Sequence, residues 1–168
     1  VPQVDQAEYE DLRAQVFQPI ENYEVGRNEI VAGTVSPSYL LPIQGLQRLE
    51  KIMDEYVGGT NTNYLTNEPM LTRGLELLGM LKEDLPNLGA DSLHQLMRAW
   101  ELQHRVLAAE CVTQHTMYRK ETRWPGYYYR ADHPKLDDKD WHCFTLSQYD
   151  EKSGEWEMSK APVHHIID

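Results

Sequence analysis

The apolar residues of this chain follow a helical period as far as about residue 119 and lose it there. Side chains three and four positions apart share one face of a helix, so stretches with this spacing predict helices. A mainly α chain, built on a bundle of about four helices, is therefore expected. The predicted helices run from Asp5 to about Tyr23, from about Pro42 to Gly58-Gly59, from about Glu68 to Leu85, and from Asp91 or Ser92 to about Arg119.

Proline and glycine mark where these helices begin, bend and end. Pro19 lies inside the first helix and predicts a kink or a break, because proline donates no backbone hydrogen bond and clashes one turn back. Pro42 suits a first helical turn, and Gly58-Gly59 suits a helix end because glycine accepts a left-handed cap. Asn67 is the expected cap of the third helix.

Each predicted helix carries an apolar stripe that should face a core. The stripe of the first helix is Tyr9, Leu12, Val16, Ile20 and Tyr23. The third helix is expected to bury Leu71, Leu75, Leu78 and either Leu81 or Leu85. The longest helix has a seam of Leu93, Met97, Trp100, His104, Leu107 and Cys111, whose alternating steps of four and three are typical of packed helices.

The C-terminal residues change to a pattern typical of strands. Phe144 to Tyr149 and Glu155 to Lys160 are β-prone, and the loop between them contains Gly154, so a β-hairpin is predicted. The expected architecture is one domain: a helical bundle over about 5–120, a connector over 121–143, and a hairpin with a tail over 144–168.

The connector, which begins ETRWPGYYYRADHPKLDDKDW, has no regular period and is dense in aromatic and charged residues. One interpretation is structural: its aromatic residues clamp the hairpin onto the bundle, while Arg123 and Arg130 pair with Asp132, Asp137 or Asp138. The aromatic residues in question are Trp124, Tyr127, Tyr128, Tyr129 and Trp141. The other interpretation is a docking surface, because Tyr, Trp and Arg dominate interface hot spots.

Composition narrows the classes of function. The formal net charge of −11 repels phosphate backbones, so no nucleic-acid partner is expected. No apolar run approaches the roughly 20 residues of a membrane helix. The acidic N-terminus is unlike a signal peptide, and Cys111 and Cys143 form no disulfide framework, so a cytoplasmic location is predicted. The first residue is Val1, not Met, which favours a processed product or a piece of a longer protein.

Motifs that would identify a catalytic or cofactor site are missing. The sequence has no GxGxxG, no phosphate-binding GxxxxGK[ST], no CxxC and no HExxH. A metal site can be imagined from His133, Asp132, Asp137, Asp138 and His142, but acidic loops more often face water. We therefore predict no catalytic, cofactor-binding or metal-binding residue in this chain.

Four stretches resemble one known family. They are KIMDEYVGG at Lys51–Gly59, LHQLMRAWELQHR at Leu93–Arg105, ETRWPGYYYRADHPKLDD at Glu121–Asp138, and YDEKSGEWEM at Tyr149–Met158. In this order they resemble the C-terminal part of the flavoprotein (alpha) subunits of dissimilatory adenylylsulfate reductases. The wider family of succinate dehydrogenase and fumarate reductase flavoproteins has an Arg-Gly-x-His element here. Trp124 follows Arg123 instead, which favours the adenylylsulfate branch.

The resemblance implies what the chain is part of. The whole enzyme would reduce adenylyl sulfate by two electrons to AMP and sulfite, or run in reverse. FAD would bind in N-terminal domains outside this chain, and a beta subunit would carry [4Fe-4S] clusters. This chain would support the FAD-binding domain and the subunit contact, with Arg123, Tyr128, Arg130, Asp132 and His133 as the expected contact residues. On this view Arg130→Ala should weaken assembly more than it lowers the melting temperature.

Three other hypotheses stay open at this point. In the first, the chain is a stand-alone protein-interaction module. In the second, it is a fragment of a succinate dehydrogenase or fumarate reductase flavoprotein. In the third, it is a small metal-dependent enzyme that uses the acidic loop.

Overall fold

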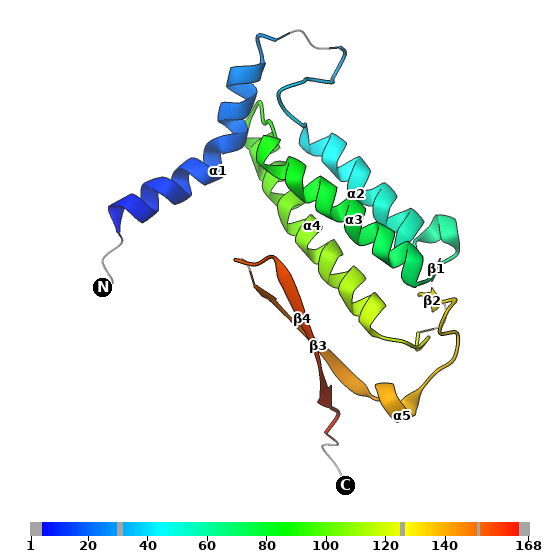
Figure 1. Ribbon diagram of the computed structural model, residues 1–168. Coiled ribbons are helices and arrows are strands. Elements are labelled where there is room, and N and C mark those ends of the chain that lie inside the picture. Colours follow the sequence, from blue (N-terminus) through cyan, green and yellow to red (C-terminus); the bar gives the residue numbers. More distant parts are fainter. Residues whose placement is uncertain (1–4, 30–31, 125–126, 151, 165–168) are drawn as a thin grey trace. The chain divides into compact units, whose positions relative to one another are not determined.

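The structure is a computed structural model, and it describes residues 5–29, 32–124, 127–150 and 152–164. The chain forms two compact units, one of residues 1–49 with 80–106 and one of residues 50–79 with 107–168. Figure 1 shows the succession of helices followed by a hairpin, so the expected mainly α fold is confirmed. No helix within the described ranges is both long and apolar enough to cross a membrane.

Helix α1 (Gln6–Gly26) begins with a side-chain cap and bends at its proline. The Asp5 carboxylate accepts a hydrogen bond from the Ala7 N–H at 2.9 Å, which satisfies one free donor of the first turn. Pro19 is buried inside the helix, and its carbonyl accepts from the Ala90 N–H at 2.8 Å. Figure 1 shows α1 changing direction without interruption, so the kink is confirmed and a break is not found.

The next three helices begin close to the predicted residues. They are α2 (Pro42–Tyr56), α3 (Glu68–Asp84) and α4 (Leu93–Tyr118). Asn67 caps α3 by accepting from the Met70 N–H, and Ser92 caps α4 by accepting from the Gln95 N–H. Gly58, which follows α2, has a φ of 91°, the left-handed conformation expected of a glycine helix end.

Each unit has its own apolar core. In the unit of residues 1–49 and 80–106 the buried apolar residues are Leu49, Leu81, Leu88, Ala90, Leu96, Ala99, Leu102 and Val106. In the other unit they are Ile52, Val57, Leu71, Leu78, Ala109 and Trp141. The face predicted for α3 is largely confirmed, because Leu71, Leu78 and Leu81 are buried and Leu75 is half-buried.

The seam predicted for α4 is wrong. Leu93 is 72% exposed and Met97 54% exposed, whereas the neighbouring stripe, which includes Leu96, Ala99 and Leu102, is buried. Small residues on the buried stripe allow close helix packing, and the α2 backbone at Gly45 lies so near α4 that a Cβ there would come within 2.4 Å of Leu102. Periodicity finds a helix, but it does not decide between two adjacent apolar stripes.

The four strands found in the described residues all belong to the unit of residues 50–79 and 107–168. The predicted hairpin is confirmed as β3 (Cys143–Asp150) and β4 (Glu155–Pro162), which pair antiparallel with Ser147 opposite Met158. Gly154, in the loop, has a φ of 72°. The connector is less irregular than expected: β2 (Tyr129–Arg130) pairs in parallel with β1 (Leu65–Thr66), and α5 (Asp138–Trp141) precedes the hairpin. Two short 3-10 turns, η1 (Thr60–Thr62) and η2 (Leu85–Asn87), are the remaining elements of the part of the chain that the structure describes.

Candidate functional site in the connector

Arg130 is the centre of the connector, and its side chain is completely buried. One guanidinium nitrogen, Nη1, donates to the carbonyl oxygens of Thr116, Met117 and Arg119 at 2.5, 3.2 and 3.1 Å. The last carbonyls of a helix have no partner inside it, and a cation complements the negative end of the helix dipole. Arg130 therefore caps the C-terminal end of α4.

A second edge of the planar Arg130 guanidinium binds Asp132. Its Nε and Nη2 donate to the two carboxylate oxygens at 2.9 and 2.8 Å, which is the bidentate geometry of a strong ion pair. The Glu68 N–H donates to the same carboxylate at 2.9 Å, joining the start of α3 to the connector. The hydrogen bonds from Arg130 hold the pKa of Asp132 well below its usual range, against the opposing effect of partial burial.

Glu121 is the second buried charge, and two arginines neutralise it. Arg119 donates to its carboxylate at 2.5 Å, Arg123 donates to both oxygens at 2.7 and 3.0 Å, and the Asp137 N–H donates at 2.9 Å. Burial on its own raises the pKa of Glu121, but these hydrogen bonds outweigh it, and the pKa is lowered. The carboxylate therefore stays ionised inside the protein.

The same network fastens α5 and the hairpin to α4. Arg119 also donates to the carbonyls of Trp141 and Cys143 at 2.8 and 2.9 Å. Trp141 is buried edge-on against Tyr118, and the Lys160 ammonium lies 3.4 Å from the centre of its ring. These contacts link the end of α4, α5 and both hairpin strands. The structural interpretation of Arg123, Arg130 and Trp141 is thus supported by their contacts.

His115 provides a further link between α4 and β3. Its two ring nitrogens lie 3.0 Å from the hydroxyls of Thr145 and Ser147, and the Cys111 sulfur lies 3.7 Å from the same Ser147 oxygen. Burial, and secondly the charge of Arg119, lower the pKa of His115, which favours the neutral ring. Cys111 is only half-buried, but its side chain belongs to this packing contact.

Several connector aromatics do not clamp the hairpin, which corrects the sequence interpretation. Trp124 is 61% exposed and Tyr127 78% exposed, and Tyr129 is also at the surface. Residues with bulky apolar rings are usually covered when they stabilise a fold, so the exposed rings of Trp124 and Tyr127 contribute little to the packing of this unit. Tyr128 is half-buried, and burial raises its pKa.

The turn after α2 is a part of this site that the sequence did not reveal. Asn63 and Tyr64 have φ angles of 51° and 62°, a conformation that non-glycine residues adopt at an energetic penalty of about 1–3 kcal/mol each. The Asp54 carboxylate holds the turn by accepting from the side chains of Thr60 and Asn61. The Tyr64 carbonyl then accepts from the Tyr129 N–H at 2.7 Å, which fixes the register of β1 and β2. A run of polar residues such as TNTN predicts a loop but not its geometry.

A metal ion does not suit the carboxylates of the connector. Ligand atoms of Glu68, Asp132 and His133 lie within 4.8 Å of one another. However, both Asp132 oxygens already accept hydrogen bonds from Arg130. The guanidinium neutralises the carboxylate, and its positive charge would repel a metal ion. Asp137 caps α5, and Asp138 pairs with Arg123 at 2.9 Å, so the larger cluster imagined from the sequence is divided among other partners.

Comparison with known proteins decides the family. Residues 46–166 match the model of the fumarate reductase flavoprotein C-terminal family. The chain belongs to this family. The match covers the whole connector and the hairpin but begins inside α2, so α1 lies outside it.

Within the family, the resemblance to adenylylsulfate reductases is confirmed. The chain is 41% identical over 158 residues to the adenylylsulfate reductase subunit alpha of Megalodesulfovibrio gigas, covering 94% of this chain and 24% of the relative. The solved adenylylsulfate reductase of Archaeoglobus fulgidus is 51% identical with a TM-score of 0.95, covering 100% of this chain and 26% of that one. This chain therefore spans about a quarter of the length of these relatives.

More distant members share the fold. The quinol fumarate reductase of Escherichia coli is 17% identical with a TM-score of 0.71, over 99% of this chain and 27% of that one. The fumarate reductase flavoprotein C-terminal fold is thus retained where most side chains differ.

Proposed function

We propose that this chain is the C-terminal helical domain of the flavoprotein (alpha) subunit of an adenylylsulfate reductase. The observation that carries the proposal is the difference in similarity within one family. Identity is 41–51% to adenylylsulfate reductases over nearly the whole chain, against 17% to a fumarate reductase. A succinate dehydrogenase or fumarate reductase fragment is accordingly the second candidate.

The activity belongs to the whole subunit, in which adenylyl sulfate takes up two electrons and yields AMP and sulfite, or the reverse. FAD would supply the redox chemistry from the domains that make up the rest of the relatives' length. A beta subunit with [4Fe-4S] clusters would deliver the electrons. Cys111 and Cys143 are free thiols, which suits a reducing cytoplasm.

This chain's own contribution is a rigid contact surface. We place it on Arg123, Tyr128, Arg130, Asp132 and His133, the contact set expected from the sequence. Arg123, Tyr128 and His133 are half-buried and Asp132 reaches the surface, while the buried Arg130 holds Asp132 from behind. The exposed rings of Trp124 and Tyr127 extend this surface, since large aromatic side chains dominate interface energetics. The partner is the FAD-binding domain or the iron–sulfur subunit.

The proposal is tested with the full-length flavoprotein and its partner subunit. The expected result is a flavin absorption spectrum and release of sulfite from adenylyl sulfate with a reduced electron donor. Reduction of fumarate without sulfite release would favour the second candidate. A full-length protein that binds no flavin would contradict both candidates. It would favour the hypothesis that the chain is a stand-alone protein-interaction module. The 168-residue chain alone is expected to release no sulfite.

A further inference from the structure

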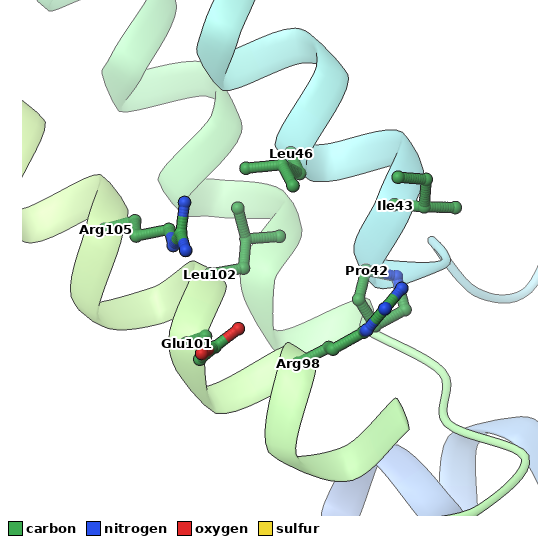
Figure 2. Close-up of a pocket in the computed structure, with 7 residues that line it drawn as sticks. All are labelled: Pro42, Ile43, Leu46, Arg98, Glu101, Leu102 and Arg105. Carbon is green, nitrogen blue, oxygen red and sulfur yellow. The ribbon is translucent and has the colours of Figure 1, made fainter. Parts of the chain in front are cut away.

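A pocket of about 330 Å³ lies between α2 and α4 within the unit of residues 1–49 and 80–106. Its floor and walls are apolar, and its rim is charged. The seven lining residues are Pro42, Ile43 and Leu46 from α2, and Arg98, Glu101, Leu102 and Arg105 from α4. Figure 2 shows Leu102 between the two arginines, with Leu46 facing it from α2.

The backbone explains why the pocket exists. Arg98, Leu102 and Arg105 are four and three positions apart, so they lie along one face of α4. Gly45 brings the α2 backbone against Leu102, and any side chain there would collide with it. Ile43 and Leu46 flank this close approach, and Ile43 is exposed although it is large and apolar.

The two pocket arginines are exceptional in this chain. Acidic residues outnumber lysine and arginine by 27 to 16, so partners for a guanidinium are abundant. Every other arginine forms an ion pair within the described residues: Arg13, Arg27, Arg48, Arg73, Arg119, Arg123 and Arg130. Within the same described ranges, Arg98 and Arg105 have neither an ion pair nor a hydrogen bond from their side chains.

We propose that this pocket binds an acidic segment of the same flavoprotein polypeptide, from the part that lies outside this chain. Carboxylates of that segment pair with Arg98 and Arg105, and an apolar side chain between them packs on Leu102 and Leu46. Seven residues along α4 correspond to about 10 Å, so the two carboxylates stand about that far apart. A central acidic residue is disfavoured, because Glu101, which lies between Arg98 and Arg105 along α4, also lines the pocket.

The size of the pocket favours a segment of the same polypeptide over a separate subunit. A stable interface between separate proteins uses roughly 20–30 residues on each side, and this pocket offers seven. An intramolecular partner has an effective concentration in the millimolar range, so a few contacts keep it bound. The chain covers 24–26% of its relatives' length, and the remainder supplies such segments. The inference rests on the proposed function only in requiring a longer polypeptide.

Arginine-selective labelling of the full-length flavoprotein, followed by mass spectrometry, tests this. Without its partner subunit, Arg98 and Arg105 should react about tenfold more slowly than Arg73, the factor that about 1.4 kcal/mol of contact free energy gives. Arg73 is the internal control because its side chain is half exposed and carries only a surface ion pair. Equal rates for all three arginines would overturn the proposal. Protection that arises only when the partner subunit is added would also overturn it, and would assign the pocket to that subunit.

Amide hydrogen exchange in a double variant, compared with a single control variant, provides the second readout. Arg98→Gln with Arg105→Gln should increase amide hydrogen exchange around Ile43 and Leu46 in the full-length flavoprotein, whereas Arg73→Gln should not. Unchanged exchange in the double variant would count against an occupied pocket. Flavin content and sulfite release, measured on the same samples, report on the proposed function separately, so the two proposals can fail independently.

Discussion

The first half of α1 exposes apolar side chains, whereas the connector buries charged ones. Both are the reverse of the usual arrangement, in which apolar residues are buried and charged residues face water. In α1 the apolar stripe faces solvent, with Tyr9 50% and Leu12 54% exposed. In the connector Glu121 and Arg130 are completely buried, and each is satisfied by partners in its own unit. The buried charges of the connector therefore have their partners within this chain, whereas the apolar stripe in the first half of α1 is left uncovered by it.

This difference between α1 and the connector shows which structural features of a fragment can be explained without the rest of the protein. Buried charges are stable only when their hydrogen bonds are made, so a satisfied network indicates that these charged groups need no partner outside the chain. A contiguous apolar stripe in water indicates the reverse. Substitutions in the connector should therefore lower the stability of the isolated chain, and substitutions on the α1 stripe should not.

The largest effect is expected from Arg130→Ala. It leaves the Asp132 carboxylate without its bidentate partner and the last carbonyls of α4 without a cap, which should lower the free energy of unfolding by about 3–5 kcal/mol. Chemical denaturation of the chain measures this. Arg73→Ala is the matched control, because its ion pair is exposed and should contribute at most about 1 kcal/mol. Equal effects of the two variants would contradict the connector's structural role.

That expectation reverses the one drawn from the sequence, in which Arg130→Ala weakens assembly more than stability. Sequence indicated that Arg123 and Arg130 would pair with Asp132, Asp137 or Asp138, but the burial of Arg130 was not visible, because arginine is usually a surface residue. The hydrogen bonds to Thr116, Met117 and Arg119 depend on where α4 ends relative to β2. Such placement is a property of the tertiary structure and leaves no local pattern.

An intermediate effect is expected from pH. The pKa values of Asp132 and Glu121 are lower in the folded chain than in the unfolded chain, where they are about 4. The stability that these groups contribute is therefore fully present above about pH 4 and is lost as the pH falls further. Because the pKa of His115 is also lowered, a separate loss should begin below about pH 6.5.

Unfolding midpoints measured from pH 7 to pH 3 test both losses. Asp132→Asn should flatten the decline below pH 4, and His115→Gln should remove the earlier decline. If Asp132→Asn keeps the wild-type dependence on pH below 4, its carboxylate is not held as the structure indicates.

The smallest effect is expected from Leu12→Ala, although leucine-to-alanine changes in a core lower stability by about 2–5 kcal/mol. Because Leu12 faces solvent, the isolated chain should change by no more than about 0.5 kcal/mol. Leu102→Ala, the same change at a buried position of the same unit, is the control and should show the full core effect. A large loss for Leu12→Ala in the isolated chain would mean that its stripe is already packed.

Sequence predicted the elements better than the faces they bury. Pro42, Asn67 and Gly154 have local conformational requirements, and each marks the element boundary or turn that was expected. The buried face of α4 was missed because Leu93 and Met97 are as apolar as core residues, although the described chain leaves them exposed. Their side chains, like the stripe in the first half of α1, lie outside the cores of the described residues.

Hydrogen exchange in the isolated chain measures the contrast between the two regions most directly. The Thr122, Tyr129 and Ala131 amides bond to Lys135, Tyr64 and Thr66, and they should exchange only when the unit opens. The amides of residues 9–15 in α1, which precede the hydrogen bond from Trp100 to the Val16 carbonyl, should exchange about a thousandfold faster. This ratio corresponds to about 4 kcal/mol of opening free energy, because a short helix without packing is marginal in water. Equal exchange in the two regions would contradict the claim that the buried network of the connector is satisfied within this chain while the first half of α1 is left unpacked.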